Sequence, residues 1–233
     1  MTKVSCIICV FNEEKQVGAV LRALRGHPLV DEVIVVDDGS TDHTVEIVEQ
    51  HQRDGHETLH LVAHERNRGK SAAFATGVTR ARNDLLLFLD GDLVGLTADD
   101  VTALITPVAD GQADMSLSLK QNSLETYKFL GLDFVSGERV YAKHVIEGHL
   151  DAIARLPSFA VETYVNRLVI ERASRIASVW WPRVTHLRKS HKYGTLRGTW
   201  GEFRMIIQIC RLESPFRLLA LYRRMLRLTT RVG

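Results

Sequence analysis

The chain has 233 residues, of which 45% are hydrophobic and 25% charged, a size and composition typical of a soluble globular protein. Three cysteines and the lack of a signal-like N-terminal pattern argue against a secreted disulfide framework, and no apolar run approaches the roughly 18 residues that span a bilayer. The net charge of +2 hides an asymmetry, because residues 183–233 hold 12 Lys or Arg and only 2 Asp or Glu. We therefore expect an acidic body with a basic C-terminal segment that favours an anionic partner.

Strand and helix patterns alternate through the first 120 residues. We predict strands at residues 3–10, 33–36, 58–63, 85–89 and 113–119. We also predict one helix that ends near residue 24, one that begins at a Ser40 or Thr41 cap, one that spans residues 71–82 and one that begins at a Thr97 cap. Cys6 and Cys9 share the first strand but face opposite sides, and we interpret them as core thiols. The alternation predicts an α/β fold with a mainly parallel sheet and helices on both faces.

The pattern changes after residue 120. We expect residues 122–148 to be rich in loops, residues 157–177 to form a long helix and residues 178–181 a short strand. Residues 203–231 combine Arg and apolar side chains in the manner of a basic amphipathic helix. These patterns predict one α/β domain at residues 1–202 and a helical tail at residues 203–233.

Two apolar runs end in acidic clusters. Residues 33–36 lead into Asp37 and Asp38, and residues 85–89 lead into the triplet Asp90-Gly91-Asp92. Ligands of open α/β sheets bind outside the carboxyl ends of the strands, where paired carboxylates suit a hard divalent cation shared with phosphates. The alternative for the triplet is a simple turn, since Asp and Gly are common turn residues.

Seven motifs in chain order carry a resemblance to a known family. They are Cys9–Glu14, Val36–Asp42, Asn67–Phe74, Asp90–Asp92, Val135–Tyr141, Phe159–Glu162 and Lys192–Gly194. Together they resemble family 2 of the glycosyltransferases, which have the GT-A fold. The resemblance is greatest to the branch of dolichyl-phosphate mannosyltransferase and related polyprenyl-phosphate glycosyltransferases. The chain departs from the family at Cys9, where a proline is common, and in lacking the transmembrane helices that some members of the branch carry.

The resemblance implies a metal-dependent, inverting glycosyltransferase with a UDP- or GDP-sugar donor and Mg²⁺ or Mn²⁺. The residues that it assigns to the nucleotide sugar are Val10, Asn12, Glu13, Asp37, Asp38, Lys70, Asp90 and Gly91. Asp38 should accept hydrogen bonds from the base, because a carboxylate only accepts, and Lys70 at a helix start should meet the diphosphate. The resemblance assigns the metal, which stabilises the leaving diphosphate, to Asp90, Asp92 and His186. An ordinary surface histidine is the alternative for His186.

The acceptor side centres on Arg139, whose guanidinium fork matches phosphate oxygens. By resemblance, Ser136, Arg139 and Lys192 hold an acceptor phosphate, with Lys120 and Arg188 as helpers. A surface Arg paired with an acid is the alternative for Arg139.

Catalytic roles follow by resemblance for Asp92, Arg139 and Glu162. Glu162 is either a general base or a carboxylate that orients the site, and its role depends on the acceptor. A phosphate acceptor is already ionised at pH 7 and needs no base, whereas a hydroxyl acceptor does.

The identity of the acceptor stays open. The best candidate is a polyprenyl phosphate at the cytoplasmic face, and the alternative is a soluble phosphorylated metabolite or a glycan hydroxyl. A nucleotidyltransferase or a non-catalytic sugar-nucleotide binder is the alternative of another class. The first would typically open with a Gly-rich loop where residues 11–14 stand, and the second would be expected to lose the acidic triplet.

The tail at residues 203–233 allows two interpretations. A basic amphipathic helix can lie in an anionic membrane interface, which would place a cytoplasmic protein at the inner face of the membrane. Alternatively, its apolar face packs on the domain or forms a homo-oligomer. We expect no nucleic acid partner, because the chain contains no recognised RNA- or DNA-binding module.

Overall fold

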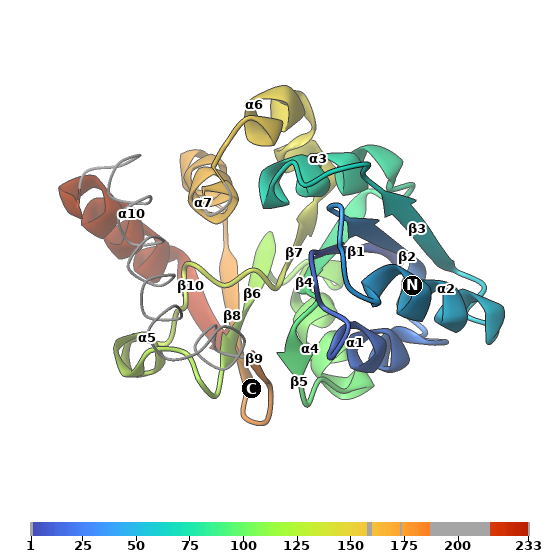
Figure 1. Ribbon diagram of the computed structural model, residues 1–233. Coiled ribbons are helices and arrows are strands. Elements are labelled where there is room, and N and C mark those ends of the chain that lie inside the picture. Colours follow the sequence, from blue (N-terminus) through green and yellow to red (C-terminus); the bar gives the residue numbers. More distant parts are fainter. Residues whose placement is uncertain (1, 158–159, 173, 187–214, 233) are drawn as a thin grey trace.

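The computed structural model describes residues 2–157, 160–172, 174–186 and 215–232, drawn in colour in Figure 1. Within them, eight strands form one sheet in the order β10-β8-β6-β7-β4-β1-β2-β3. These strands are β1 (Val4–Val10), β2 (Val30–Asp37), β3 (Leu59–Ala63), β4 (Leu85–Asp90), β6 (Met115–Lys120), β7 (Arg139–Ala142), β8 (Ile176–Trp181) and β10 (Thr229–Val232). Only β7 runs antiparallel to its neighbours β4 and β6; every other pairing in this sheet is parallel. A separate antiparallel ribbon joins β5 (Leu93–Val94) to β9 (Thr185–His186).

Helices cover both faces of the sheet, as the alternating sequence pattern predicts (Figure 1). They are α1 (Val17–Leu24), α2 (Thr44–Arg53), α3 (Lys70–Arg80), α4 (Ala98–Ala109), α5 (Glu125–Leu130), α6 (Leu150–Ala154), α7 (Val161–Glu171) and α10 (Pro215–Leu228), with 3₁₀ turns η1 (Lys143–Val145) and η2 (Glu147–His149). One core contains Ile8 and buried residues of α1, α2 and α4, and the other contains Ile7 and buried residues of α3, α6, α7 and α10. Consecutive strand residues enter different cores because they point to opposite faces of the sheet. The predicted fold class is therefore confirmed.

The two predicted helix caps have different outcomes. The cap at Thr97 is confirmed, because its side chain and that of Asp100 form a reciprocal capping box at the start of α4. The cap at Ser40 or Thr41 is wrong, because α2 begins only at Thr44. Ser40 and Thr41 instead bond the backbone and side chain of Asn12, which lies at the end of β1.

Three expectations for the second half are also wrong in their bounds. Residues 122–148 are not only loops, since they contain α5 and the central strand β7. The helix expected at 157–177 is limited to α7, and Ile176 and Ala177 belong to β8. The expected helix at 203–231 is confirmed from Pro215 to Leu228, but residues 229–232 form the edge strand β10 beside β8. Its first part, residues 203–214, lies outside the described residues. Among the described residues, no helix is long and apolar enough to cross a membrane.

Candidate active site at the carboxyl edge of the sheet

The two predicted acidic clusters lie at the same edge of the sheet. In the parallel pairing, Val10 on β1 is level with Asp37 on β2, and Cys9 is level with Asp90 on β4. Burial raises the pKa of Cys9 to about 12, so this thiol stays protonated and behaves as a core group. Burial likewise raises the pKa of Cys6. The interpretation of both cysteines as core thiols is consistent with this environment.

The segment after β1 is fastened to the segment after β2. Asn12 takes the left-handed conformation with a φ of 57°, which turns the chain so that its side-chain oxygen accepts from the Thr41 amide at 2.8 Å. The amide of Glu13 donates to Thr44 Oγ1 at 2.8 Å, and the amide of Glu14 donates to Asp42. The first two motifs therefore form one rigid rim of the site.

Asp37 and Asp38 hold loops rather than point freely into solvent. Asp37 Oδ2 accepts from the amides of Gly39 and Ser40. Asp38 is buried and accepts from the amides of Arg68 and Gly69 at 2.9 and 2.7 Å. These bonds place the Asn67–Lys70 loop against the end of β2. The assignment of Asp38 to the nucleotide base stays a prediction.

His64 is a partner of Asp38 that the sequence analysis missed. Its Nδ1 lies 2.8 Å from Asp38 Oδ1, and its Nε2 lies 3.0 Å from the hydroxyl of Thr76 on α3. Both His64 and Asp38 side chains are buried. No spacing in the sequence signals this contact, because it depends on β3 lying beside β2.

Lys70 is the first residue of α3 and joins two carboxylates. Its Nζ lies 2.9 Å from Asp90 Oδ1 and 2.9 Å from Glu162 Oε1 at the start of α7. Burial alone would lower the pKa of Lys70, but Asp90 and Glu162 outweigh it and raise that pKa well above its ordinary value. Burial would likewise raise the pKa of Glu162, but Lys70 and Arg139 hold it below its ordinary value. Lys70 and Glu162 therefore both remain charged near neutral pH.

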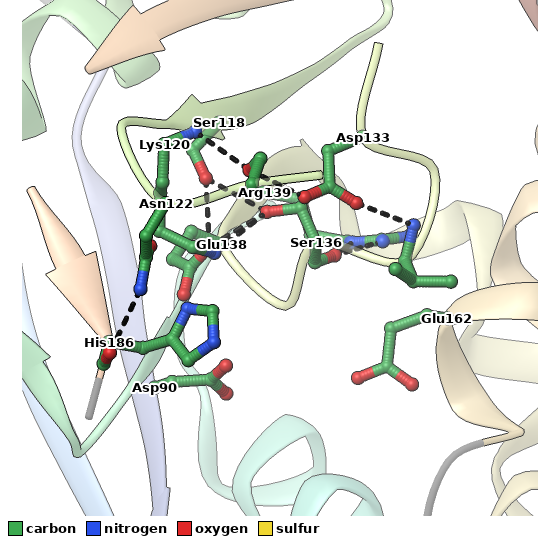
Figure 2. A network of polar contacts seen from close by, with 12 residues as sticks. Asp90, Ser118, Lys120, Asn122, Asp133, Ser136, Glu138, Arg139, Glu162 and His186 are labelled. Atoms are coloured by element: carbon green, nitrogen blue, oxygen red, sulfur yellow. Dashed lines mark hydrogen bonds and ion pairs between the residues drawn. The ribbon is translucent and has the colours of Figure 1, made fainter. Parts of the chain in front are cut away.

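The acidic triplet is followed directly by the ribbon that carries His186. Gly91 packs so closely on Val10 that a Cβ would lie 2.6 Å from Val10 Cγ1, which requires glycine here. Asp92 is half-buried in the turn between β4 and β5. The pairing of Leu93 with His186 brings the imidazole to the same place, and Figure 2 shows it beside the Asp90 carboxylate.

Asp90, Asp92 and His186 stay the predicted metal ligands, and they do not form a closed cage. Burial and the Lys120 charge lower the pKa of His186, so its imidazole is neutral and able to bind a metal at neutral pH. Among the described residues, no three His, Cys, Asp or Glu side chains are arranged around a single point. The carboxylates of the triplet with one imidazole suit Mg²⁺ or Mn²⁺ that is shared with ligand phosphates.

Arg139 is fully inside the protein, at the start of β7. Its Nε and Nη2 donate to the carbonyl of Ser136, and its Nη1 donates to Asn166 Oδ1 at 3.0 Å. The alternative of a surface Arg paired with an acid is excluded by its 2% exposure and by these partners. Asn166, also fully buried, fixes the guanidinium and gave no signal in the sequence.

A cavity of about 20 Å³, room for about one water molecule, brings the charged groups together. Lys70, Asp90, Arg139 and Glu162 line it together with apolar side chains of the sheet, α3 and α7. The hydroxyl of Tyr141, which also lines it, is buried with no hydrogen-bond partner among the described residues. Lys70 and Asp90 are predicted to bind the donor, whereas Arg139 and Glu162 are predicted to bind the acceptor or take part in catalysis. Residues of both predicted sides thus line the same cavity.

Ser136 and Lys120 belong to a buried network beside this cavity (Figure 2). Lys120 forms an ion pair with Glu138, and its side chain is only 5% exposed. Ser136 donates to Glu138 at 2.7 Å. Lys120 is therefore neutralised within the protein. The predicted residues Lys192 and Arg188, and Phe159 of the sixth motif, lie outside the described residues.

The model of the family described as "Glycosyl transferase family 2" matches residues 5–126. A dodecaprenyl-phosphate galacturonate synthase of Rhizobium johnstonii is 32% identical over 126 residues, which cover 52% of this chain and only 36% of that protein. An undecaprenyl-phosphate 4-deoxy-4-formamido-L-arabinose transferase of Pseudomonas paraeruginosa is 27% identical over 243 residues, with 94% of this chain and 68% of that protein covered.

Solved structures support the fold. Glucosyl-3-phosphoglycerate synthase from Mycobacterium tuberculosis, crystallised with Mn²⁺, UDP and glucosyl-3-phosphoglycerate, has a TM-score of 0.68 at 20% identity. The match covers 90% of this chain and 79% of that chain. The same enzyme has also been crystallised with Mg²⁺ and UDP. At this identity the likeness shows the shared GT-A fold.

Proposed function

The chain belongs to glycosyl transferase family 2, and from that premise we propose that it transfers a sugar from a nucleoside diphosphate sugar to a polyprenyl phosphate. One observation carries the proposal: Lys70 and Asp90, assigned to the donor, and Arg139, assigned to the acceptor, line the same cavity. A transferase must bring two anionic substrates together, and Lys70 and Arg139 provide a cation for each of them where the two sides meet at this small cavity. The names of the two relatives above support the acceptor class.

The donor would lie along the carboxyl edge of β1, β2 and β4. We propose that the rim at Val10, Asn12 and Glu13, with Asp37 and Asp38, contacts the nucleoside. The ammonium of Lys70, at the N-terminus of α3, would bind the diphosphate, since both the charge and the helix end favour an anion. Asp90, relieved of Lys70, would then face the ribose or the metal.

Asp92, with Asp90 and His186, would hold Mg²⁺ or Mn²⁺. Such a cation, when bound, stabilises the negative charge that develops on the leaving nucleoside diphosphate. Gly91 keeps the backbone of the triplet close to Val10, which fixes where the two carboxylates point.

The acceptor phosphate would approach from the side of Arg139, with Ser136 and Lys192 as further contacts. A phosphate oxygen attacks the anomeric carbon, its new bond to carbon forms as the bond to the diphosphate oxygen breaks, and the configuration inverts. No proton has to be removed from such an acceptor at pH 7. Glu162, kept ionised by Lys70 and Arg139, would orient these two cations rather than act as a strong base.

A soluble phosphorylated acceptor is the second candidate. It is favoured by the structural neighbour crystallised with glucosyl-3-phosphoglycerate. A glycan hydroxyl is less well supported, because a carboxylate with a lowered pKa is a weaker base. A nucleotidyltransferase or a non-catalytic binder has no support in the family match.

A screen of donors and acceptors tests the proposal. Purified protein with Mn²⁺ is incubated with UDP- or GDP-sugars. Each donor is tested with undecaprenyl phosphate, with 3-phosphoglycerate and without an acceptor, and the released nucleoside diphosphate is measured. We expect release that depends on undecaprenyl phosphate and on one class of donor. Dependence on 3-phosphoglycerate alone would favour the second candidate, and no release with any pair would refute a transferase of this type.

Binding provides a separate test of the donor site. UDP or GDP with Mn²⁺ should raise the melting temperature, because a ligand that binds only the folded state stabilises it, by about 2.7 kcal/mol at one hundred times its Kd. No shift with either nucleotide would count against the donor site itself.

A further inference from the structure

The turn Ser136–Gly137–Glu138 touches both substrate sides of the proposed site. On one side, a Cβ added to Gly137 would lie 2.6 Å from Asp90 Oδ2, so the backbone of this turn rests against the donor-side carboxylate. On the other side, the carbonyl of Ser136 accepts from Arg139 Nε at 3.0 Å. A movement of this short segment would therefore displace Asp90 and Arg139 together.

Buried polar contacts with β6 hold the turn in place (Figure 2). Glu138 Oε2 accepts from Ser136 Oγ at 2.7 Å and from Ser118 Oγ at 2.8 Å. The same oxygen accepts from Lys120, which reaches it from β6. Glu138 is 0% exposed and Lys120 is 4% exposed, so solvent does not compete for these contacts.

The ion pair is not explained by stability alone. Two charges taken out of water lose hydration that their attraction only partly restores, and buried pairs can often be replaced by apolar side chains without loss of stability. Lys120 is also not accessible to a substrate, because its side chain is only 5% exposed and Glu138 holds its ammonium. The pair is therefore better explained by the position that Glu138 imposes on the turn.

We propose that Lys120 and Glu138 are positioning residues that fix the Ser136–Gly137 turn, and through it the relative placement of Asp90 and Arg139. Glu138 supplies the acceptor atom for Ser136, and Lys120 keeps Glu138 ionised and in place. The proposal rests on the proposed function, because it assigns Asp90 to the donor and Arg139 to the acceptor. It adds a residue pair that contacts neither substrate.

Two matched double variants separate positioning from charge. Lys120→Met/Glu138→Gln removes both charges but keeps an amide oxygen that can accept from Ser136 and Ser118. Lys120→Met/Glu138→Leu removes both charges and the acceptor, while the 2.8 Å contact between the two serines can remain. Calorimetry measures the Kd of each variant for farnesyl phosphate and, separately, for UDP with Mn²⁺, and the melting temperature reports stability.

We expect the Gln variant to bind both probes within about threefold of wild type, and the Leu variant to bind both at least tenfold more weakly at a similar melting temperature. Equal affinities in the two doubles would overturn the positioning role. If the Leu variant does not fold, Ser136→Ala, which removes only the hydroxyl of the turn, is the fallback. Because Ser136 is itself a proposed acceptor contact, the deciding readout is UDP–Mn²⁺ affinity, which must also fall at least tenfold, and wild-type UDP–Mn²⁺ affinity in it would overturn the proposal. Wild-type protein that binds neither probe would instead refute the proposed function.

Discussion

The ammonium of Lys70 lies 2.9 Å from a carboxylate oxygen of Glu162, although ninety-two positions separate the two residues in the chain. The same ammonium lies 2.9 Å from Asp90 at the end of β4. One cation thus joins α3, the acidic triplet and α7. Without it, two carboxylates would face the same small cavity with only Arg139 to balance them.

Replacement of Lys70 should therefore affect binding before it affects the fold. We expect Lys70→Met to weaken UDP–Mn²⁺ binding at least tenfold, equivalent to about 1.4 kcal/mol, because the diphosphate loses its cation and the two carboxylates repel it. Calorimetry gives the affinity. Lys3→Met, which removes an exposed lysine at the opposite end of β1, is the matched control and should bind normally. Wild-type affinity in Lys70→Met would exclude the assigned role.

Asp92 should be required for transfer but not for folding. We expect Asp92→Asn to lower transfer at least a hundredfold, about 2.7 kcal/mol in the barrier, while the melting temperature stays within a few degrees. The assay is diphosphate release in excess Mn²⁺, with a chelator-treated wild type beside it. Asp99→Asn, on the exposed first turn of α4, is the control. Normal turnover in the presence of excess chelator would contradict a metal at this triplet.

The sequence could predict that the two acidic clusters lie at one edge of the sheet, because this placement follows from the topology of parallel strands. Asp37 and Asp90 each end an apolar run, and parallel strands put such ends at one edge whatever the loops do. Lys70 could be placed in the same way, as a residue at a helix start after a glycine. Neither placement needs any knowledge of side-chain contacts.

The acceptor side could be predicted only in part. Arg139 was expected from its motif, but the motif lies among Gly, Ser and charged residues, and it forms a strand only because β4 and β6 pair with it from both sides. The partnership of Asn166 with Arg139 depends on how α7 crosses the sheet, which no local pattern encodes.

The end of the chain shows a conflict between two local signals. Leu226, Arg227 and Leu228 continue the helical spacing of α10, which led to the expectation of a helix up to residue 231. The β-branched residues Thr229, Thr230 and Val232 favour a strand, and the free edge of β8 decides the outcome.

Acid should destabilise the protein through Glu138. Burial would raise the pKa of this carboxyl, but Lys120 and the serine hydroxyls outweigh burial and hold it far below its ordinary value of 4.5. A group with a lowered folded-state pKa contributes stability that is fully present above pH 4.5 and is lost as the pH falls toward the folded-state pKa. The loss approaches about 1.4 kcal/mol per pH unit for one group.

Urea unfolding at a series of pH values measures this effect. Below pH 4.5, the stability of wild type should fall more steeply than that of Lys120→Met/Glu138→Gln, in which the group cannot titrate. Between pH 5 and 7, the difference between the two proteins should stay constant. Parallel curves below pH 4.5 would mean that Glu138 does not carry its charge in the folded protein.

The helix α10 should bind anionic membranes. Residues 215–232 contain five Arg and no Asp or Glu. Phe216 is 85% exposed and Leu219 is 47% exposed, so the outer face of α10 combines apolar side chains with Arg223 and Arg227. Such a face suits the interface of an anionic bilayer, where each basic residue contributes on the order of 1 kcal/mol and salt weakens the attraction. A site for polyprenyl phosphate would need this kind of contact.

Sedimentation with phosphatidylglycerol-containing vesicles decides whether the contact exists. We expect the intact chain to pellet at low salt and to be released at high salt. Arg223→Gln/Arg227→Gln should weaken binding about tenfold or more, because two contributions on the order of 1 kcal/mol are lost. Arg53→Gln/Arg80→Gln removes the same charge from exposed positions on α2 and α3 and should bind as wild type does. Equal losses in both variants would indicate attraction by net charge alone. No binding by wild type would limit α10 to its packing on the core, because the helix would then have no affinity for the surface on which a lipid acceptor is presented.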